Sequence, residues 1–286
     1  VDTGNAGTVM RFLTAYLART EGRWLLTGTT RMQQRPIGLL VDALIHLGAE
    51  ISYTAAAGYP PLLITGKPLK GGKIAIDASV SSQFITSLML IAPTLKGGLT
   101  IELKGEEVSF PYLELTAALM RDAGAEVQFK GKKIQVKEGK YKLNDCPIEA
   151  DWGSASYWYE IAAIDQSTDI LLEGYSRNSL QGDSRIAEIF TELGVETVYQ
   201  DSGILLRATG NIRKSIDLNL SGQPDLVPAI TATCAALGVK ARISGVAHLR
   251  FKESDRIEVL SKELGKIGAA LSFSDDVLEL LPGKLD

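Results

Sequence analysis

The sequence predicts an α/β protein assembled from a repeated β-α-β-α-β-β unit, and three observations lead to this fold class. Four segments share one pattern, in which apolar residues at helical spacing are followed by a glycine and then by an apolar, strand-like run. A second series of apolar helices precedes these segments. Several of the helices are apolar over most of their surface, which predicts helices buried inside a ring of sheets.

The repeated segments recur about every 70–76 residues, at 39–53, 113–129, 186–199 and 257–273. Each contains a glycine that fits a helix C-terminal cap, because glycine readily adopts the left-handed conformation that ends a helix. These glycines are Gly48, Gly124, Gly194 and Gly268. A period this long indicates a packed subdomain and not a short solenoid repeat.

The remaining elements can be placed around these segments. We expect the preceding helices at 5–18, 81–92, 153–164 and 225–237, each opening with small or polar capping residues. We expect strands at 23–29, 62–65, 73–78, 99–104, 134–137, 148–150, 169–173, 204–207, 216–220, 241–246 and 277–280. In this interpretation the first unit lacks its leading strand and three units are complete.

Composition excludes several classes of protein. With 286 residues, 45% hydrophobic and 22% charged, the chain fits a soluble globular protein with two cores. Its net charge of −4 provides no basic surface for nucleic acid. We expect neither a membrane span nor a signal peptide. Cys146 and Cys234 match no metal-binding or redox spacing, so we expect no metal and a cytoplasmic location.

A polar stretch at 130–145, rich in lysine and glycine, marks the approach to a domain boundary. We therefore predict two domains, at 1–147 and 148–286. The sequence begins at Val1 without a methionine and leads at once into a glycine-rich turn. We accordingly expect the chain to be part of a longer protein.

The most highly charged stretch is 249–257, which packs five charged side chains into seven residues between an apolar strand and an apolar helix. If the helix starts near Ser254, Glu253 and Arg256 lie one turn apart and Lys252 stands just outside the first turn. A carboxylic acid beside two cations suits a site that handles anions and protons. A solvated, salt-bridged helix start is the alternative interpretation.

Two further helix starts have the chemistry of anion sites. Glycines in the run 4–8 allow close approach of a ligand, and the N–H groups of a helix start attract anions. The alternative is a tight turn with an Asn or Thr cap. Arg31 and Arg35 precede another helix, with Pro36 at its expected first turn, and arginine suits bidentate binding of phosphate or carboxylate. Solvated surface arginines remain the alternative.

Hydroxyl, amide and carboxyl groups occupy equivalent positions in later units. Ser81, Ser82 and Gln83 form a neutral cradle for an anion, although a simple cap explains one of the serines. Ser109 by itself fits a helix cap. Asp225 opens an apolar helix, where a carboxylate fits a structural N-cap or a general base. A symmetric fold would bring these helix starts toward one cleft suited to a substrate with several negative charges.

A set of motifs runs in order along the chain: GNAGT followed by Arg11, RMQQRP, SVSSQF, VSFPY, SASYW, Gly182-Asp183, Pro224-Asp225 and RFKESDRI. Together they resemble the 5-enolpyruvylshikimate-3-phosphate synthase family nearly end to end. The resemblance implies a two-domain inverted α/β barrel, each domain holding three β-α-β-α-β-β units in the family. It also implies transfer of an enolpyruvyl group from phosphoenolpyruvate to the 5-hydroxyl of 3-phosphoshikimate, on the route to chorismate and the aromatic amino acids. Neither a cofactor nor a metal is implied, and we expect a monomer.

The resemblance also implies roles for individual residues. Asp225 would be the base on the 5-hydroxyl, and Glu253 the carboxyl group that protonates the methylene carbon. The residues that would hold 3-phosphoshikimate are Ser81, Ser82, Gln83, Ser109, Asp225, His248 and Lys252. Those that would contact phosphoenolpyruvate are Asn5, Gly7, Arg35, Gln83 and Arg256. Asp255 keeps a structural role at the helix start.

The chain departs from the family pattern in several places. An N-terminal Lys-Ser and Arg segment, a later His-Arg motif and a C-terminal lysine are absent, so we expect this chain to lack a unit of each domain and to have little or no activity alone. Phe12 stands where many members have proline, and His248 where many have asparagine, so the roles of both stay open. Gly7, where other members have alanine, fits the glyphosate-sensitive pattern of the family. We therefore expect glyphosate to inhibit the intact enzyme in competition with phosphoenolpyruvate.

Two alternatives remain open at this stage. A UDP-N-acetylglucosamine enolpyruvyl transferase would share the fold but uses a cysteine on a mobile loop, and neither Cys146 nor Cys234 lies in a suitable loop. The second alternative is a non-catalytic module that binds a phosphate-bearing ligand.

Overall fold

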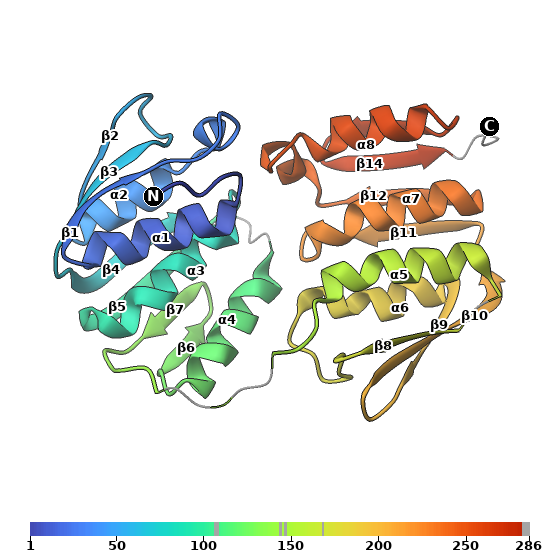
Figure 1. Ribbon diagram of the computed structural model, residues 1–286, viewed down its shortest axis with the longest axis horizontal. Helices are drawn as coiled ribbons and strands as arrows, with labels where there is room; N and C mark the ends of the chain where they lie inside the picture. The colour runs from blue at the N-terminus through green and yellow to red at the C-terminus, as the bar shows by residue number, and fades with distance from the viewer. Residues whose placement is uncertain (106–108, 143–144, 146–147, 168, 282–286) are drawn as a thin grey trace. The chain divides into compact units, whose positions relative to one another are not determined.

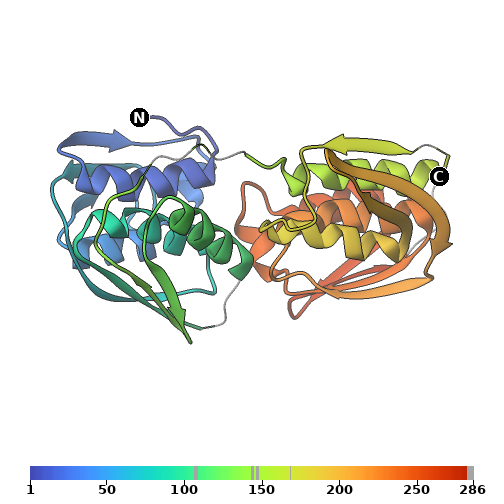
Figure 2. The same cartoon turned by 90° about the horizontal axis from the view of Figure 1, so that it is seen from below.

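The computed structural model describes residues 1–105, 109–142, 145, 148–167 and 169–281. These residues form eight α-helices and fourteen strands in four sheets. The chain divides into two compact units, Val1–Asp145 with Phe251–Ser254, and Cys146–Arg250 with Asp255–Asp286. Each unit has its own hydrophobic core, in which helices pack against one face of the sheets (Figures 1 and 2).

The first unit contains two of the predicted repeats. Its first repeat consists of α1 (Gly7–Arg19), β1 (Gly22–Leu26), the 3₁₀ helix η1 (Met32–Gln34), α2 (Gly38–His46), β2 (Glu50–Tyr53) and β3 (Leu62–Gly66). Its second consists of β4 (Lys70–Asp77), α3 (Ser82–Ile91), η2 (Ala92–Thr94), β5 (Lys96–Lys104), α4 (Phe110–Asp122), β6 (Val127–Lys130) and β7 (Lys133–Val136). The sheets have the strand orders β1-β3-β2 and β4-β5-β7-β6.

The second unit repeats this plan. Its first repeat consists of α5 (Trp152–Asp165), β8 (Ile170–Glu173), η3 (Gly182–Arg185), α6 (Ile186–Thr191), β9 (Leu193–Tyr199) and β10 (Gly203–Ile212). Its second consists of β11 (Ser215–Asn219), η4 (Pro224–Leu226), α7 (Val227–Leu237), β12 (Lys240–Ser244), η5 (Ala247–Phe251), α8 (Arg256–Gly265), β13 (Ala270–Ser274) and β14 (Val277–Leu281). The sheets have the orders β8-β10-β9 and β11-β12-β14-β13.

The two four-stranded sheets share one topology, which confirms the predicted β-α-β-α-β-β unit. In each sheet the leading strand pairs in parallel with the next, as Ile74 does with Ile101 and Ile216 with Ala241. The other pairs are antiparallel. The first repeat lacks a full leading strand, as predicted, and only an isolated parallel bridge joins Asp2 to Thr27.

Helices α3 and α7 are the most deeply buried parts of the two cores. Eight of the ten residues of α3 and seven of the eleven residues of α7 are buried. In the first unit α3 packs against α1 on one side and α4 on the other, and Figure 1 shows α1 and α3 side by side. The prediction that these helices are buried, made from their apolar composition, is therefore confirmed for these two.

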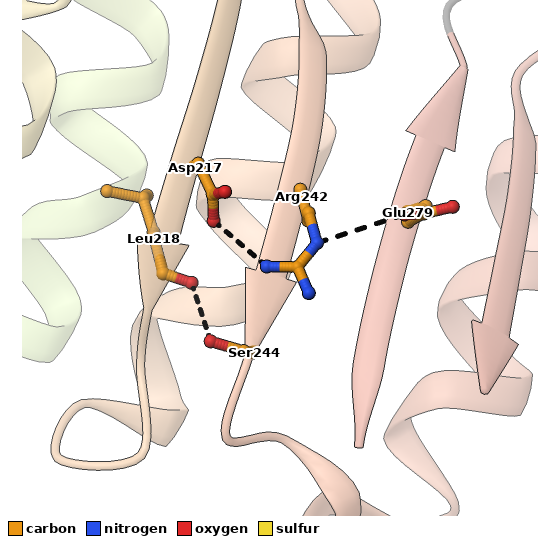
Figure 3. Close-up of polar contacts among 5 residues, drawn as sticks. All are labelled: Asp217, Leu218, Arg242, Ser244 and Glu279. Carbon is orange, nitrogen blue, oxygen red and sulfur yellow. Dashed lines mark hydrogen bonds and ion pairs between the residues drawn. The ribbon is translucent and has the colours of Figure 1, made fainter. Parts of the chain in front are cut away.

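The sheet of the last repeat separates an apolar face from a charged one. Ile216, Ala241 and Leu280 face the core. On the other face Arg242 of β12 lies between Asp217 of β11, at 3.3 Å, and Glu279 of β14, at 3.9 Å (Figure 3). All three side chains are about half exposed or more, so these cross-strand ion pairs contribute at most about 1 kcal/mol each.

Two predicted elements were wrong. The segment 148–150 forms no strand, so the sheet of the third repeat has three strands and two repeats are complete, not three. Ile148 is 97% exposed, and the carboxylate of Glu149 instead accepts hydrogen bonds from Trp152, Ser179 and Gln181. These bonds hold the segment against a loop and not beside a strand.

The predicted role of Gly194 as a helix cap was also wrong. Gly194 lies inside β9, where its φ of +86° coincides with a register shift opposite residues Ala208 and Ile212. A side chain there would meet Ile212 at 2.9 Å. Gly48 and Gly124 do follow the caps of α2 and α4, with φ of +95° and +83°, as predicted.

Candidate active site

The start of α1 carries no side-chain cap. Its N-cap residue is Ala6, which makes no side-chain cap hydrogen bond, and the first turn contains no acidic residue. The alternative interpretation, an Asn or Thr cap, is therefore wrong, and Asn5 is exposed. Because the first N–H groups of a helix have no partner within the helix and lie at the positive end of its dipole, this end of α1 favours an anion.

Gly7 allows two arginines to approach this helix start. A Cβ atom at Gly7 would lie 2.7 Å from Nη1 of Arg35 and 2.8 Å from Nη1 of Arg11, closer than any ordinary contact. Arg11 is 4% exposed and Arg35 is 7% exposed. Burial, with the nearby charge of Arg35, lowers the pKa of Arg11 to about 9. Two buried guanidinium groups at an uncapped helix start form a strongly electropositive site.

The loop that carries Arg35 differs from the prediction. Pro36 lies before α2, which begins at Gly38 with Ile37 as its N-cap residue, so Pro36 is not in the first turn. Arg35 instead ends η1, and its backbone N–H donates to the carbonyl of Met32 at 3.0 Å. This short 3₁₀ turn places Arg35 against Gly7.

The start of α3 joins the start of α1. Ser81 is the N-cap residue of α3 and accepts a hydrogen bond from the backbone N–H of Gln83 at 3.3 Å. Nε2 of Gln83 donates to Oγ1 of Thr8 at 3.1 Å. Ser82, the first residue of α3, is buried. The structure thus brings together Gly7, Arg35 and Gln83, which the resemblance had assigned to one ligand.

Ser109 has a strained backbone at the start of α4. Its φ of +56° lies in the left-handed region, which residues other than glycine adopt only when the surroundings impose it. The residue is 5% exposed, and it makes no side-chain cap hydrogen bond although it occupies the N-cap position. An ordinary capping role therefore does not describe Ser109.

In the second unit, the expected role of Asp225 as a helix cap was wrong. Asp225 lies in η4, and the N-cap residue of α7 is Leu226. Oδ1 of Asp225 instead accepts a hydrogen bond from Nη1 of Arg256 at 2.6 Å. Two residues that the sequence placed in different roles therefore form a charged pair at the starts of α7 and α8.

Within the charged stretch 249–257, Asp255 has a structural role as a helix cap, whereas Glu253 lies before the helix. Helix α8 begins at Arg256, later than predicted, with Asp255 as its N-cap residue. Asp255 accepts a hydrogen bond from the backbone N–H of Glu258 at 3.0 Å and pairs with Arg250 at 3.5 Å, which confirms its predicted structural role. His248 lies in η5. Glu253 precedes the helix, so it is not one helical turn from Arg256.

Residues 251–254 group with the first unit. Arg31 donates through Nη2 to the backbone oxygen of Lys252 at 3.0 Å and through Nε to that of Glu253 at 3.2 Å. The sequence suggested that Arg31 is either an anion ligand or a solvated surface arginine, and this contact was not predicted. The two residues are 221 and 222 positions from Arg31, so no local pattern could have revealed the contact.

The cysteines offer no nucleophile in the described part of the chain. Cys234 is fully buried in α7, and burial raises the pKa of its thiol to about 12, so the reactive thiolate is suppressed. Cys146 lies outside the described residues. Within the described ranges, no cluster of three or more His, Cys, Asp or Glu residues is arranged to hold a metal ion. Nor does any helix described here have the length and apolar character needed to cross a membrane.

Comparison with known proteins identifies the family. A family model described as EPSP synthase (3-phosphoshikimate 1-carboxyvinyltransferase) matches residues 1–286. The chain belongs to this family. It is 47% identical over 277 residues to the 3-phosphoshikimate 1-carboxyvinyltransferase of Bacteroides fragilis, a match that covers 96% of this chain and 68% of the relative. It is 38% identical over 284 residues to the enzyme of that name from Colwellia psychrerythraea, covering 98% of this chain and 66% of that protein.

Solved structures agree with this assignment. A 2.37 Å structure of EPSP synthase from Acinetobacter baumannii aligns with a TM-score of 0.74 at 25% identity, over 98% of this chain and 64% of that one. A second structure of EPSP synthase from A. baumannii aligns with a TM-score of 0.72 at 23% identity and supports the fold alone. The predicted fold class, the inverted α/β barrel of this family, is confirmed. The chain spans about two thirds of the length of these relatives.

Proposed function

We propose that a protein containing this chain transfers the enolpyruvyl group of phosphoenolpyruvate to the 5-hydroxyl of 3-phosphoshikimate and releases phosphate. Membership of the EPSP synthase family supports this reaction. The observation that carries the proposal is the approach of two buried guanidinium groups to Gly7 at an uncapped helix start. Such a site suits a small substrate bearing a phosphate and a carboxylate.

In the first unit, Gly7, Arg35 and Gln83 would contact phosphoenolpyruvate, with Asn5 on the same turn. Arg35 offers a planar fork of N–H donors, and the side-chain amide of Gln83 is already fixed by Thr8. The buried Ser82 and Ser109, with Ser81, would hold 3-phosphoshikimate through their hydroxyl groups. These roles come from the family motifs and are compatible with the placement of each side chain at a helix start.

In the second unit, Asp225 would take the proton of the 5-hydroxyl as its oxygen attacks C2 of phosphoenolpyruvate. Protonation of the methylene carbon by Glu253 would complete a tetrahedral adduct. Loss of phosphate, with return of a methyl proton to a base, then restores the double bond. Arg256 now pairs with Asp225 at 2.6 Å, so Arg256 would have to exchange this partner for the substrate before Asp225 acts as a base. Lys252 and His248 would contact 3-phosphoshikimate.

The wider assignments belong to the same proposal. Residues 1–147 and 148–286 would correspond to the two domains of the family, the protein would act as a cytoplasmic monomer, and its partners would be the two small substrates. A UDP-N-acetylglucosamine enolpyruvyl transferase gains no support from the described residues, because Cys234, the cysteine among them, is buried in a helix and not in a loop. Sedimentation equilibrium would test the monomer.

The deciding experiment uses a chimaera, in which the parts of the B. fragilis relative that lie outside the match are joined to this chain. We expect phosphate release that requires both phosphoenolpyruvate and 3-phosphoshikimate, and none with UDP-N-acetylglucosamine. Release of phosphate from phosphoenolpyruvate with UDP-N-acetylglucosamine, and not 3-phosphoshikimate, as the acceptor would replace the proposal by the rival reaction. Binding of 3-phosphoshikimate by calorimetry without any turnover would instead support a non-catalytic module. The 286-residue chain, assayed in parallel, should show little or no turnover.

A further inference from the structure

Arg11 is a buried arginine whose charge forms part of the proposed anion site, but it is not among the residues proposed to contact either substrate. It lies in the first turns of α1 and is 4% exposed. Arginine is rarely buried unless its guanidinium group has specific partners, because removing the charge from water costs free energy. The contacts of Arg11 therefore indicate what the residue does.

The guanidinium group of Arg11 joins three segments of the first unit. Nη1 donates to the backbone oxygen of Gly7 at 3.1 Å, and Nη2 donates to that of Pro36 at 3.3 Å. Nη1 also lies 3.8 Å from the sulfur of Met32. The central carbon lies 5.8 Å from the ring centroid of Phe84 in α3. The partners thus belong to the start of α1, the loop after η1 and the start of α3.

Each of the three segments carries one residue proposed to contact phosphoenolpyruvate. Gly7 is itself a partner of Arg11, Arg35 adjoins Pro36, and Gln83 adjoins Phe84. The planar fork of a guanidinium group sets the separation of the two carbonyl groups that it bridges. A change at position 11 would therefore alter the spacing of all three proposed ligands.

The surroundings of Arg11 are unfavourable for a charged side chain. All the partners of Arg11 named above are uncharged, and among the described residues its buried Nε has no hydrogen-bond partner. Burial and the nearby charge of Arg35 also lower its pKa to about 9, because both act against the charged form. A well-packed apolar side chain would be less costly at such a position, so packing alone does not account for an arginine here.

We propose that Arg11 is a positioning residue, which holds the start of α1, the Arg35 loop and the start of α3 at the spacing required for Gly7, Arg35 and Gln83 to contact one anion. This inference rests on the proposed function. Lysine at position 11 keeps the charge but replaces the planar fork by a single ammonium group. The substitution Arg11→Lys therefore separates positioning from charge.

The first test measures hydrogen–deuterium exchange on the 286-residue chain. Backbone amides of Met10, Gln34 and Arg35 are hydrogen-bonded, so protection in both segments can be followed. We expect Arg11→Lys to speed exchange about tenfold or more in peptides covering residues 4–10 and 31–37. The matched control is Arg121→Lys, whose Nε donates to the carbonyl of Val127 at 3.0 Å, and it should leave these peptides unchanged. Unchanged exchange at 31–37 in Arg11→Lys would overturn the proposal.

The second test measures the kinetics of the chimaera. Arg11→Lys should raise KM for phosphoenolpyruvate about tenfold or more, with KM for 3-phosphoshikimate changed by less than about twofold. A purely structural role would reduce the amount of folded enzyme and leave both KM values unchanged, and that result would overturn the inference. If the unsubstituted chimaera is inactive, the proposed function fails, whereas the exchange experiment still decides whether Arg11 holds the three segments together.

Discussion

Substitution of Gly7 by alanine tests the geometry of the proposed phosphoenolpyruvate site. The added methyl group would stand 2.7 Å from Nη1 of Arg35 and 2.8 Å from Nη1 of Arg11, whereas ordinary contact begins at 3.4 Å. The guanidinium groups must therefore retreat by about 0.7 Å. Such a shift would take the 3.1 Å hydrogen bond between Arg11 and the Gly7 carbonyl beyond normal length and would displace Arg35 from its anion.

The expected loss is one charge-assisted hydrogen bond to the ligand, about 1.5–3 kcal/mol, which corresponds to an increase of about 10- to 150-fold in KM for phosphoenolpyruvate. Folding should survive, because alanine is favoured over glycine in a helix by up to about 1 kcal/mol, which offsets part of the crowding. Steady-state kinetics of the chimaera, together with thermal unfolding of each variant, would measure both quantities.

Gly265→Ala is a matched control at the end of α8, where a Cβ atom would meet nothing within 4 Å. It should leave KM unchanged and stabilise the protein by about 0.4–1 kcal/mol. If Gly7→Ala leaves KM for phosphoenolpyruvate within about twofold of the unsubstituted value, Arg35 does not bind the ligand at this helix start and the reasoning fails.

Three further predictions concern other groups. Asp225→Asn should lower kcat of the chimaera about 10²–10⁴-fold, and activity above a tenth of normal would exclude Asp225 as the base. Because the ion pair of Asp225 with Arg256 is partly exposed, the free energy of unfolding should change by less than about 1 kcal/mol. In a Cys146→Ser background, Cys234 should react with a thiol reagent only as fast as the chain unfolds, since its pKa is raised to about 12, and rapid labelling in the native state would contradict its burial. Burial raises the pKa of Tyr141 from 10.0 to about 12, so the unfolded chain loses this proton first and stability should fall as the pH rises from about 10 towards 12. Denaturant titrations of Tyr141→Phe should show a shallower fall, and a pH profile identical to that of the unsubstituted chain would refute this.

Much of the fold could be predicted because local patterns and tertiary packing agree. The apolar run after Ser81, preceded by a capping hydroxyl, predicted a helix at 81–92, and α3 spans Ser82–Ile91. The alternation in 216–220 predicted a strand, and β11 spans Ser215–Asn219. In both cases the residues that favour the element are the same ones that its neighbours bury.

The predicted helix starts were wrong where two possible N-cap residues lie within a few positions of each other. If Asp225 were the N-cap residue, Pro228 would be the third residue of the helix, and proline has no N–H to donate to a capping carboxylate. The helix therefore begins at Val227, and Asp225 is left to pair with Arg256. Similarly Ser254 and Asp255 are both good caps, and the structure uses Asp255, which Arg250 also contacts.

The geometry of the site was largely beyond sequence reasoning. The motifs named Gly7, Arg35 and Gln83, but the hydrogen bond from Gln83 to Thr8 spans 75 positions and follows no periodicity. The burial of Arg11 was equally hidden, since an arginine one turn into a helix is usually solvated. The family resemblance supplied roles for residues, whereas the contacts that fix their positions required the structure.

The common topology of the two four-stranded sheets has a consequence for mutational tolerance. Strand residues such as Ile101 and Ile243 support the core, and the candidate chemistry lies at helix starts, outside the strands. A saturation screen of the chimaera, scoring cellular abundance separately from growth without aromatic amino acids, should therefore divide the positions of this chain into two classes. Polar substitutions at the core-facing positions of the strands should lower abundance, whereas substitutions such as Gln83→Ala should leave abundance intact and abolish growth. Residues that support the core and residues that bind the substrates could then change at different rates in evolution.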